Sequence, residues 1–302
     1  MAARRNPRQG QAQSRPMNAD ARSQANEETG VALVEERKRY NAMIEKWQHN
    51  LSAVLPAHMS VERFTRIVGT AVTKNPDLLR CSRQSMLSAM LDCATLGLEP
   101  GTLNQHAWLI PYEDRERGLE VQLQLGYRGL VELAMRGNSE LYHVDTEVVY
   151  EADYWRHIRG LRPSLEHTPE DVEDRGQLTY AYAIARMRGI PNEQHPFVVV
   201  GRQDILRACS PKQRQKEASG EKSIADRSPA WRYHEPEMWK KTAVRKLVKL
   251  IRQNDAALGK AISIDESAEM GVERRLSWDE VESIDVEPSR SEQERPQTAP
   301  QS

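Results

Sequence analysis

Bulky apolar residues are confined to the middle of this 302-residue chain, and their confinement limits which parts of it can fold. Residues 1–34 are basic and polar, and residues 265–302 are acidic and end in RPQTAPQS. Neither segment can bury enough apolar surface to offset the entropy lost when its backbone becomes ordered. We therefore expect a single folded core over residues 35–264, between two disordered ends.

Helical periodicity dominates the first third of this core. The spacing of apolar residues predicts helices over three ranges, namely 35–55, 60–75 and 82–96. Ser60 suits the start of the second helix, because a serine hydroxyl accepts a hydrogen bond from the first turn. Gly97 suits the end of the third, because glycine adopts the left-handed conformation that commonly terminates helices.

The middle of the core changes to the two-residue period of strands. Short β-compatible runs occupy residues 106–112, 121–125, 144–150, 179–187 and 196–200, and a helix is expected over 129–136. Runs of this kind that are joined by polar loops form antiparallel hairpins. The chain is therefore predicted to be an α+β protein, with N-terminal helices and a central antiparallel sheet packed on helices.

A total net charge of −1 hides a strong sorting of charge along the chain. Residues 202–252 carry 14 Lys and Arg against 6 acids, whereas residues 265–302 carry 4 Arg against 11 acids. Within the basic part, residues 210–230 contain little apolar material and are expected to form a mobile loop. The acidic tail is either a mimic that competes for the surface used by an anionic ligand or a handle for a separate partner.

One predicted helix concentrates the basic charge. In MWKKTAVRKLVKLIRQ (238–253), apolar residues at helical spacing predict a helix over 236–252 with one buried stripe. A second stripe carries the cations Lys241, Arg245, Lys249 and Arg252. A solvated face, a membrane surface, a protein partner and a nucleic acid are all open interpretations of such a stripe.

The motifs of several enzyme classes are missing. The Gly259–Lys260 pair does not belong to a GxxxxGK phosphate-binding loop, because Asn254 and Ala261 occupy the other required positions. No HExxH or GxSxG motif is present, and the three widely spaced cysteines indicate neither a disulfide framework nor a zinc site. No apolar run reaches the length of a membrane span. We therefore expect a soluble cytosolic protein that is not an enzyme and holds no metal.

Three blocks carry a family resemblance. The blocks LGLEPGTLNQHAWLIPY (96–112), LQLGYRGLVELAMRGNSE (123–140) and SPAWRYHEPEMWKKTAVRKL (228–247) resemble the RecT family of phage and prophage recombination annealing proteins. They occur in the family's order, and weaker similarity extends the coverage from about residue 50 to about residue 265. The chain departs from many relatives at RQND (252–255), where they have a proline-containing turn.

The resemblance implies an ATP-independent protein that binds single-stranded DNA, anneals complementary strands and promotes strand invasion or exchange in homologous recombination. It implies a homo-oligomer, either a ring or a helical filament, that also binds the annealed duplex. A 5′ to 3′ exonuclease and a host single-strand-binding protein are further implied partners, through the acidic tail. The protein would act in the bacterial cytoplasm without a required cofactor, and stimulation of annealing by magnesium stays open.

The basic helix supplies the main candidate DNA contacts by this resemblance. Lys240, Lys241 and Arg245 match the family's basic block and are expected to bind the phosphate backbone. Thr242 either adds a hydroxyl contact or bonds to a preceding helix carbonyl.

Two other segments contribute candidates. In GYRG, Tyr127 and Arg128 offer a π-face and a guanidinium plane for bases or phosphates, although Tyr127 packs equally well in a core. The remaining candidate DNA contacts are Gln124, Arg202, Lys212, Arg214, Lys216, Trp231 and Lys249. Two other function classes stay open: a sequence-specific duplex-binding regulator that inserts helix 236–252 into the major groove, and a nuclease.

Overall fold

The computed structural model describes residues 19–114, 116–220, 223, 228–251 and 256–270, with side chains from residue 34 onward. Its helices are α1 (Ala19–Val54), α2 (Val61–Lys74), α3 (Arg83–Leu96), α4 (Tyr127–Gly137), α5 (Arg202–Arg207), α6 (Pro211–Ala218), α7 (Pro229–Tyr233), α8 (Glu235–Val248) and α9 (Ala256–Met270). Its strands are β1 (Ala107–Asp114), β2 (Gly118–Leu125), β3 (Leu141–Tyr150), β4 (Tyr154–Ile158), β5 (Ser164–Thr168), β6 (Leu178–Met187) and β7 (Phe197–Gly201). Short 3-10 helices occupy Pro76–Arg80 and Asn192–Gln194.

The predicted α+β class is confirmed, as are the predicted start of α2 and the predicted end of α3, whereas the helix predicted over 236–252 ends at Val248. Ser60 caps α2 by accepting a hydrogen bond from the backbone N–H of Arg63, as a helix-starting serine should. Gly97 follows α3 with φ of 60°, the left-handed conformation that ends the helix. All three cysteines are free and buried.

The strands form three antiparallel groups. β1 pairs with β2, β4 pairs with β5, and β3, β6 and β7 form a sheet in the order β3-β6-β7. The inner face of this sheet carries Ala181, Ala183 and Ala185, whose small side chains let α8 pack closely on β6. On the outer face Tyr180 and Tyr182 alternate with these alanines.

The sequence prediction missed several elements. The β4–β5 pair was not predicted, because its strands have only five residues each and polar side chains between the apolar ones. The expected mobile loop at 210–230 contains α6 and the start of α7, and the caps of these helices, Ser210 and Ser228, each accept a backbone hydrogen bond.

The expected boundaries of the folded core do not coincide with the ends of helices. α1 begins at Ala19, inside the segment 1–34 for which disorder was expected, and the boundary at residue 264 falls within α9. Side-chain packing, which composition does not encode, holds α9 in place. Residues 1–18 and 271–302 lie outside the described residues.

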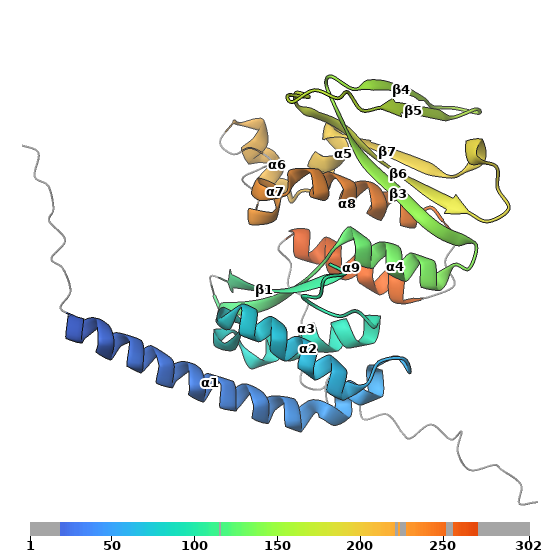
Figure 1. Ribbon diagram of the computed structural model, residues 1–302. Coiled ribbons are helices and arrows are strands. Elements are labelled where there is room, and N and C mark those ends of the chain that lie inside the picture. Colours follow the sequence, from blue (N-terminus) through green and yellow to red (C-terminus); the bar gives the residue numbers. More distant parts are fainter. Residues whose placement is uncertain (1–18, 115, 221–222, 224–227, 252–255, 271–302) are drawn as a thin grey trace, which may run out of the picture.

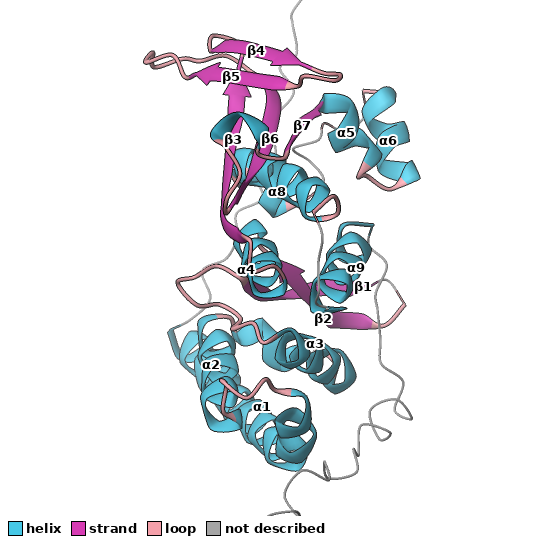
Figure 2. Cartoon of the chain, turned by 90° about the vertical axis from the view of Figure 1, so that its right-hand side faces the viewer, coloured by secondary structure: helices cyan, strands magenta, loops and turns pink. Residues whose placement is uncertain are grey.

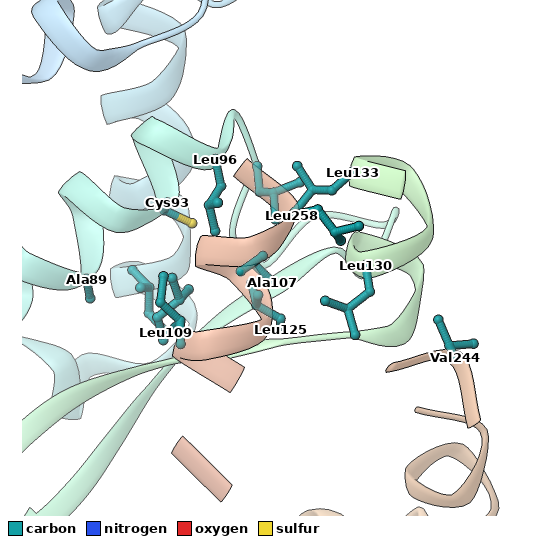
Figure 3. Packing of buried hydrophobic residues seen from close by; sticks show 14 of the residues in the cluster. Ala89, Cys93, Leu96, Ala107, Leu109, Leu125, Leu130, Leu133, Val244 and Leu258 are labelled. Carbon is teal, nitrogen blue, oxygen red and sulfur yellow. The ribbon is translucent and has the colours of Figure 1, made fainter. Parts of the chain in front are cut away.

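The elements are stacked in layers (Figures 1 and 2). Helices α1, α2 and α3 form one end, followed by β1–β2, then α4 and α9, then α8, the β3-β6-β7 sheet and finally β4–β5. One continuous apolar core runs through the inner layers, and Figure 3 shows Leu258 of α9 among Leu96, Leu130 and Leu133. Within the described ranges, every helix is too short or too polar to cross a lipid bilayer.

The second glycine of GYRG, Gly129, gives a test of this packing. A Cβ added at Gly129 would lie 2.3 Å from the backbone oxygen of His106, a contact that only a backbone shift can relieve. We expect Gly129→Ala to lower the free energy of unfolding by about 1–3 kcal/mol, measured by chemical denaturation. Gly69→Ala in α2 is the control, because nothing lies within 4 Å of the added Cβ. It should stabilise the protein by about 0.5–1 kcal/mol, and equal effects of both changes would contradict this packing.

Candidate nucleic-acid interface

Helix α8, which carries the predicted phosphate ligands, is enclosed on most of its circumference. It packs on the inner face of the sheet on one side and against α4 on another. The apolar residues Ala243, Val244, Leu247 and Val248 are buried in these contacts. The cationic stripe of α8 therefore faces the remaining neighbour, α9.

Two cations of α8 meet two carboxylates of α9 in a buried layer. Lys241 Nζ lies 2.5 Å from Asp265 and 3.7 Å from Glu269. Arg245 Nη1 lies 3.0 Å from Asp265 and 2.9 Å from Glu269. All four side chains are at most 8% exposed, so we call them the buried quartet.

Lys241 and Arg245, which are expected to bind the phosphate backbone, are buried between α8 and α9 in this structure. The spacing i, i+4 of the cations matches the spacing i, i+4 of Asp265 and Glu269, so each pair presents both charges on one side of its helix. The sequence prediction placed Asp265 at the start of a disordered tail and could not count it as a partner. DNA contact by Lys241 or Arg245 stays a prediction that would require α9 to move.

The neighbouring candidates on α8 and α7 have protein partners as well. Thr242 donates a hydrogen bond of 3.0 Å to the carbonyl of Met238, the second of the two predicted alternatives. Trp231 is buried, with an exposed fraction of 2%. Lys249 is half exposed and pairs with Glu266 of α9 at the rim of the buried quartet.

Lys240 lies on the side of α8 that faces β3. Its Nζ is 3.2 Å from Glu147 and 3.4 Å from Glu237. Partial burial by itself would lower the pKa of Lys240. The negative charges of Glu147 and Glu237 outweigh this effect, so the pKa of Lys240 is raised. Lys240 is thus a protonated cation beside two acids, and one of them, Glu147, lines a hollow to which Tyr127 and Arg128 of GYRG also contribute.

That hollow has a volume of about 560 Å³ and lies between α4 and the strands β3 and β6. Tyr127 lines it and also packs partly against the core, and stacking of its ring on bases stays a prediction. Arg128 lines it with an exposed side chain. Arg186 also lines it and pairs with Asp145 at 2.5 Å. Gln124 lies elsewhere, on β2, and donates to Gln122 at 3.1 Å.

The candidates between residues 202 and 216 occupy α5 and α6. Arg202 is exposed and pairs with Glu217, which ties α5 to α6. Arg214 and Lys216 are exposed on α6. The side chain of Lys212 lies outside the described residues.

A second and more cationic hollow runs along the outer edge of β7. Two adjoining spaces of about 810 Å³ and 680 Å³ share Arg159 and Lys246 in their walls. We call this continuous space the β7 groove. Its walls contain five Lys and Arg and two acids, namely Arg159, Arg162, Arg202, Arg207, Lys246, Glu193 and Asp204.

The charges of the β7 groove are only partly neutralised. Lys246 donates to Asp204 at 3.2 Å and to the backbone oxygen of Val199 at 3.4 Å. Among the described residues, no carboxylate lies within ion-pair distance of Arg159 or Arg162, and both are exposed. The groove can therefore attract an extended polyanion along its length.

Sequence reasoning missed Arg159, Arg162 and Arg207. The signal was the segment RHIRGLRP (156–163), in which a glycine and a proline mark a turn that is dense in arginine. The glycine, Gly160, has φ of 120°, which favours glycine because other residues rarely adopt it.

The buried quartet yields a stability prediction. Arg245→Met leaves two buried carboxylates with one cation, so we expect a loss of about 3–5 kcal/mol of unfolding free energy in chemical denaturation. Replacing the whole quartet by Lys241→Met, Arg245→Met, Asp265→Leu and Glu269→Met removes every buried charge together and should restore most of that loss. Lys249→Met, at the exposed rim, is the control and should cost less than about 1 kcal/mol. A wild-type stability for Arg245→Met would contradict the burial of these charges.

Comparisons with known proteins agree with the sequence blocks. The sequence model of the RecT family matches residues 62–277, which include β1–β2, GYRG, α8 and the β7 groove. The chain is 33% identical to Protein RecT of Escherichia coli (strain K12) over 247 residues, 81% of this chain and 80% of that protein. It is 23% identical over 151 residues to the uncharacterized protein YqaK of Bacillus subtilis (strain 168), 46% of this chain and 50% of that protein. The chain therefore belongs to the RecT family of single-strand annealing recombination proteins.

Proposed function

We propose that this protein holds single-stranded DNA along the β7 groove, anneals it to a complementary strand and promotes strand invasion or exchange without ATP. The observation that carries this proposal is the groove itself, whose exposed edge carries five Lys and Arg, of which Arg159 and Arg162 have no ion-pair partner among the described residues. Cations bind the phosphates of any sequence, so binding through them is sequence-independent. The bases stay free to pair.

The groove also offers aromatic surface. Tyr180 lines it with an exposed fraction of 38%, although its ring also stacks on Trp155, and Phe197, which contacts His157, lies at its other end. Aromatic side chains stack on any base, each contributing about 1–3 kcal/mol, which supports affinity without sequence preference. The groove thus combines the two features that sequence-independent single-strand binders share.

Annealing needs no chemical energy source. Pairing and stacking release about 1.4 kcal/mol per base-pair step, so the protein needs only to hold the strands extended and reduce their mutual repulsion. We therefore propose that no cofactor is required and that magnesium, if it stimulates the reaction, acts by screening phosphates.

One groove holds few nucleotides, so a long strand requires many subunits. We propose a homo-oligomer, a ring or a helical filament, that joins successive β7 grooves. A 5′ to 3′ exonuclease and a host single-strand-binding protein are proposed partners in the bacterial cytoplasm. Of the acidic tail proposed to bind them, residues 265–302, the structure describes only 265–270, which belong to α9.

A duplex-binding regulator is less well supported. It would insert α8 into a major groove, but most of α8 is enclosed by the sheet, α4 and α9. Its exposed cations, Lys246 and Lys249, are engaged with Asp204 and Glu266. Insertion would therefore expose an apolar helix face and separate these charges.

The groove is tested by Arg159→Gln, Arg162→Gln and Arg207→Gln combined in one protein. Loss of three phosphate contacts should make the log–log dependence of single-strand binding on salt less steep by about 2, at roughly 0.7 per phosphate. Annealing of complementary oligonucleotides, followed by fluorescence without any nucleotide triphosphate, should slow in parallel.

The control removes charge elsewhere. Arg66→Gln combined with Arg83→Gln changes two exposed arginines of α2 and α3, far along the layer stack from the groove, and should leave the salt dependence unchanged. Equal effects of the two sets would indicate a general charge effect. Discrimination between unrelated DNA sequences would instead favour the regulator, and cleavage of a labelled strand in magnesium would favour a nuclease.

A further inference from the structure

The β4–β5 hairpin lies across the outer face of the main sheet without strand pairing to it (Figure 1). Its connecting turn carries Arg159 and Arg162, the two groove arginines without an ion pair among the described residues. The position of these two cations depends on what fixes the hairpin, because no main-chain ladder does so.

One buried carboxylate ties together the base of the hairpin. Asp153 stands in the turn between β3 and β4, and its side chain is 0% exposed. It accepts hydrogen bonds from both ends of the hairpin: from the backbone N–H of Tyr150 at 2.8 Å on entry, and from that of Glu170 at 3.1 Å on exit. Asp153 thereby joins the segment that enters the hairpin to the segment that leaves it.

Two side chains complete the shell of Asp153. Arg175 donates from Nε at 2.9 Å and from Nη2 at 2.6 Å, a bidentate pair. His167 of β5 lies between Asp153 at 3.2 Å and the hydroxyl of Tyr182 at 3.2 Å, so it connects the carboxylate to the main sheet. Burial alone would raise the pKa of Asp153, but the hydrogen bonds from Arg175 and the backbone outweigh it and hold the pKa below its usual range. The carboxylate therefore stays ionised at physiological pH.

Aromatic packing sets the direction of the hairpin. Trp155 and His167 are paired across β4 and β5 and so point to the same side. Trp155 stacks on Tyr180 and Tyr182 of β6, with ring centroids 5.6 Å and 5.8 Å apart. His157 meets the edge of Phe197 on β7. These contacts aim the hairpin along β6 toward β7, where its turn forms a wall of the groove.

We propose that Asp153 is a positioning residue for DNA binding: its buried contacts with His167 and Arg175 hold the β4–β5 hairpin over the β7 groove, so that Arg159 and Arg162 act as a clamp on a single strand of nucleic acid. This inference rests on the proposed function of the groove. Asp153 itself is enclosed and does not touch the strand. Its effect on binding passes through the two arginines.

A double-mutant cycle tests the inference. We compare full-length wild type, Asp153→Asn, Arg159→Gln/Arg162→Gln, and the combination of all three changes, by single-strand binding across a range of salt concentrations. Positioning predicts that Asp153→Asn and the arginine variant each weaken binding roughly tenfold and each make the salt slope less steep by about 1.4. The combined variant should bind no more weakly than the arginine variant alone, because the arginines are then already lost.

Hydrogen exchange separates positioning from a general loss of structure. Asp153→Asn should speed exchange at the amides of β4 and β5, while those of α3 and α8 keep wild-type protection. If Asp153→Asn does not fold, Arg175→Gln removes the bidentate contact from the partly exposed side and takes its place. Asp92→Asn is the matched control, since Asp92 is also buried and ion-paired, with Lys260 at 2.9 Å, but lies in the layer of α3. It should bind DNA as the wild type does.

Each outcome has a distinct meaning. Further weakening in the combined variant, or wild-type binding by Asp153→Asn, overturns the positioning role while the groove assignment stands. Wild-type binding by Arg159→Gln/Arg162→Gln overturns the clamp and counts against the groove as the DNA site. If Asp92→Asn weakens binding to the same extent, the effect of Asp153→Asn is a general destabilisation of the protein, and the positioning role is overturned.

Discussion

The charge-balanced layer between α8 and α9 is the interaction on which the arrangement of this protein depends. Lys241 and Arg245 are buried together with Asp265 and Glu269, so two cations and two anions leave water at once. Burial raises the pKa of Asp265, whereas Lys241 and Arg245 favour its ionised form. A buried ion pair adds little net stability, but removal of one partner leaves an uncompensated charge, so the layer strongly specifies how α9 sits on α8.

This constraint divides the cations of the protein into two sets. Those of α8 that face α9 serve internal pairing, and α8 in turn holds the sheet against α4. The cations of the hairpin turn and α5 remain at the surface along β7. A polyanion would meet the second set first, because the first is separated from solvent by a helix whose apolar side, including Leu258 and Ile264, is part of the core.

The two faces of the main sheet pack against different elements. Small alanines on the inner face of β6 admit α8, while tyrosines on its outer face hold a separate hairpin through ring stacking and one buried carboxylate. The main sheet thus serves as a platform for a two-stranded hairpin, an element that is only marginally stable on its own. Binding surfaces built in this way combine precise placement with limited local stability.

The sequence by itself determined the local structure and the family. Ser60 and Gly97 define the ends of α2 and α3 through short-range hydrogen bonds and backbone conformation, and the GYRG and KKTAVRKL blocks identify RecT relatives. Only the tertiary structure decided which cations are available. The partners of Lys241 and Arg245 lie 20 or more residues further along the chain, in a helix that composition marked as a tail, and Arg162 reaches the groove through the fold of the hairpin. The sequence shows how many cations each segment carries. Whether a cation is neutralised depends on its distance in space from an acid, because Coulomb energy depends on that distance and not on the separation along the chain.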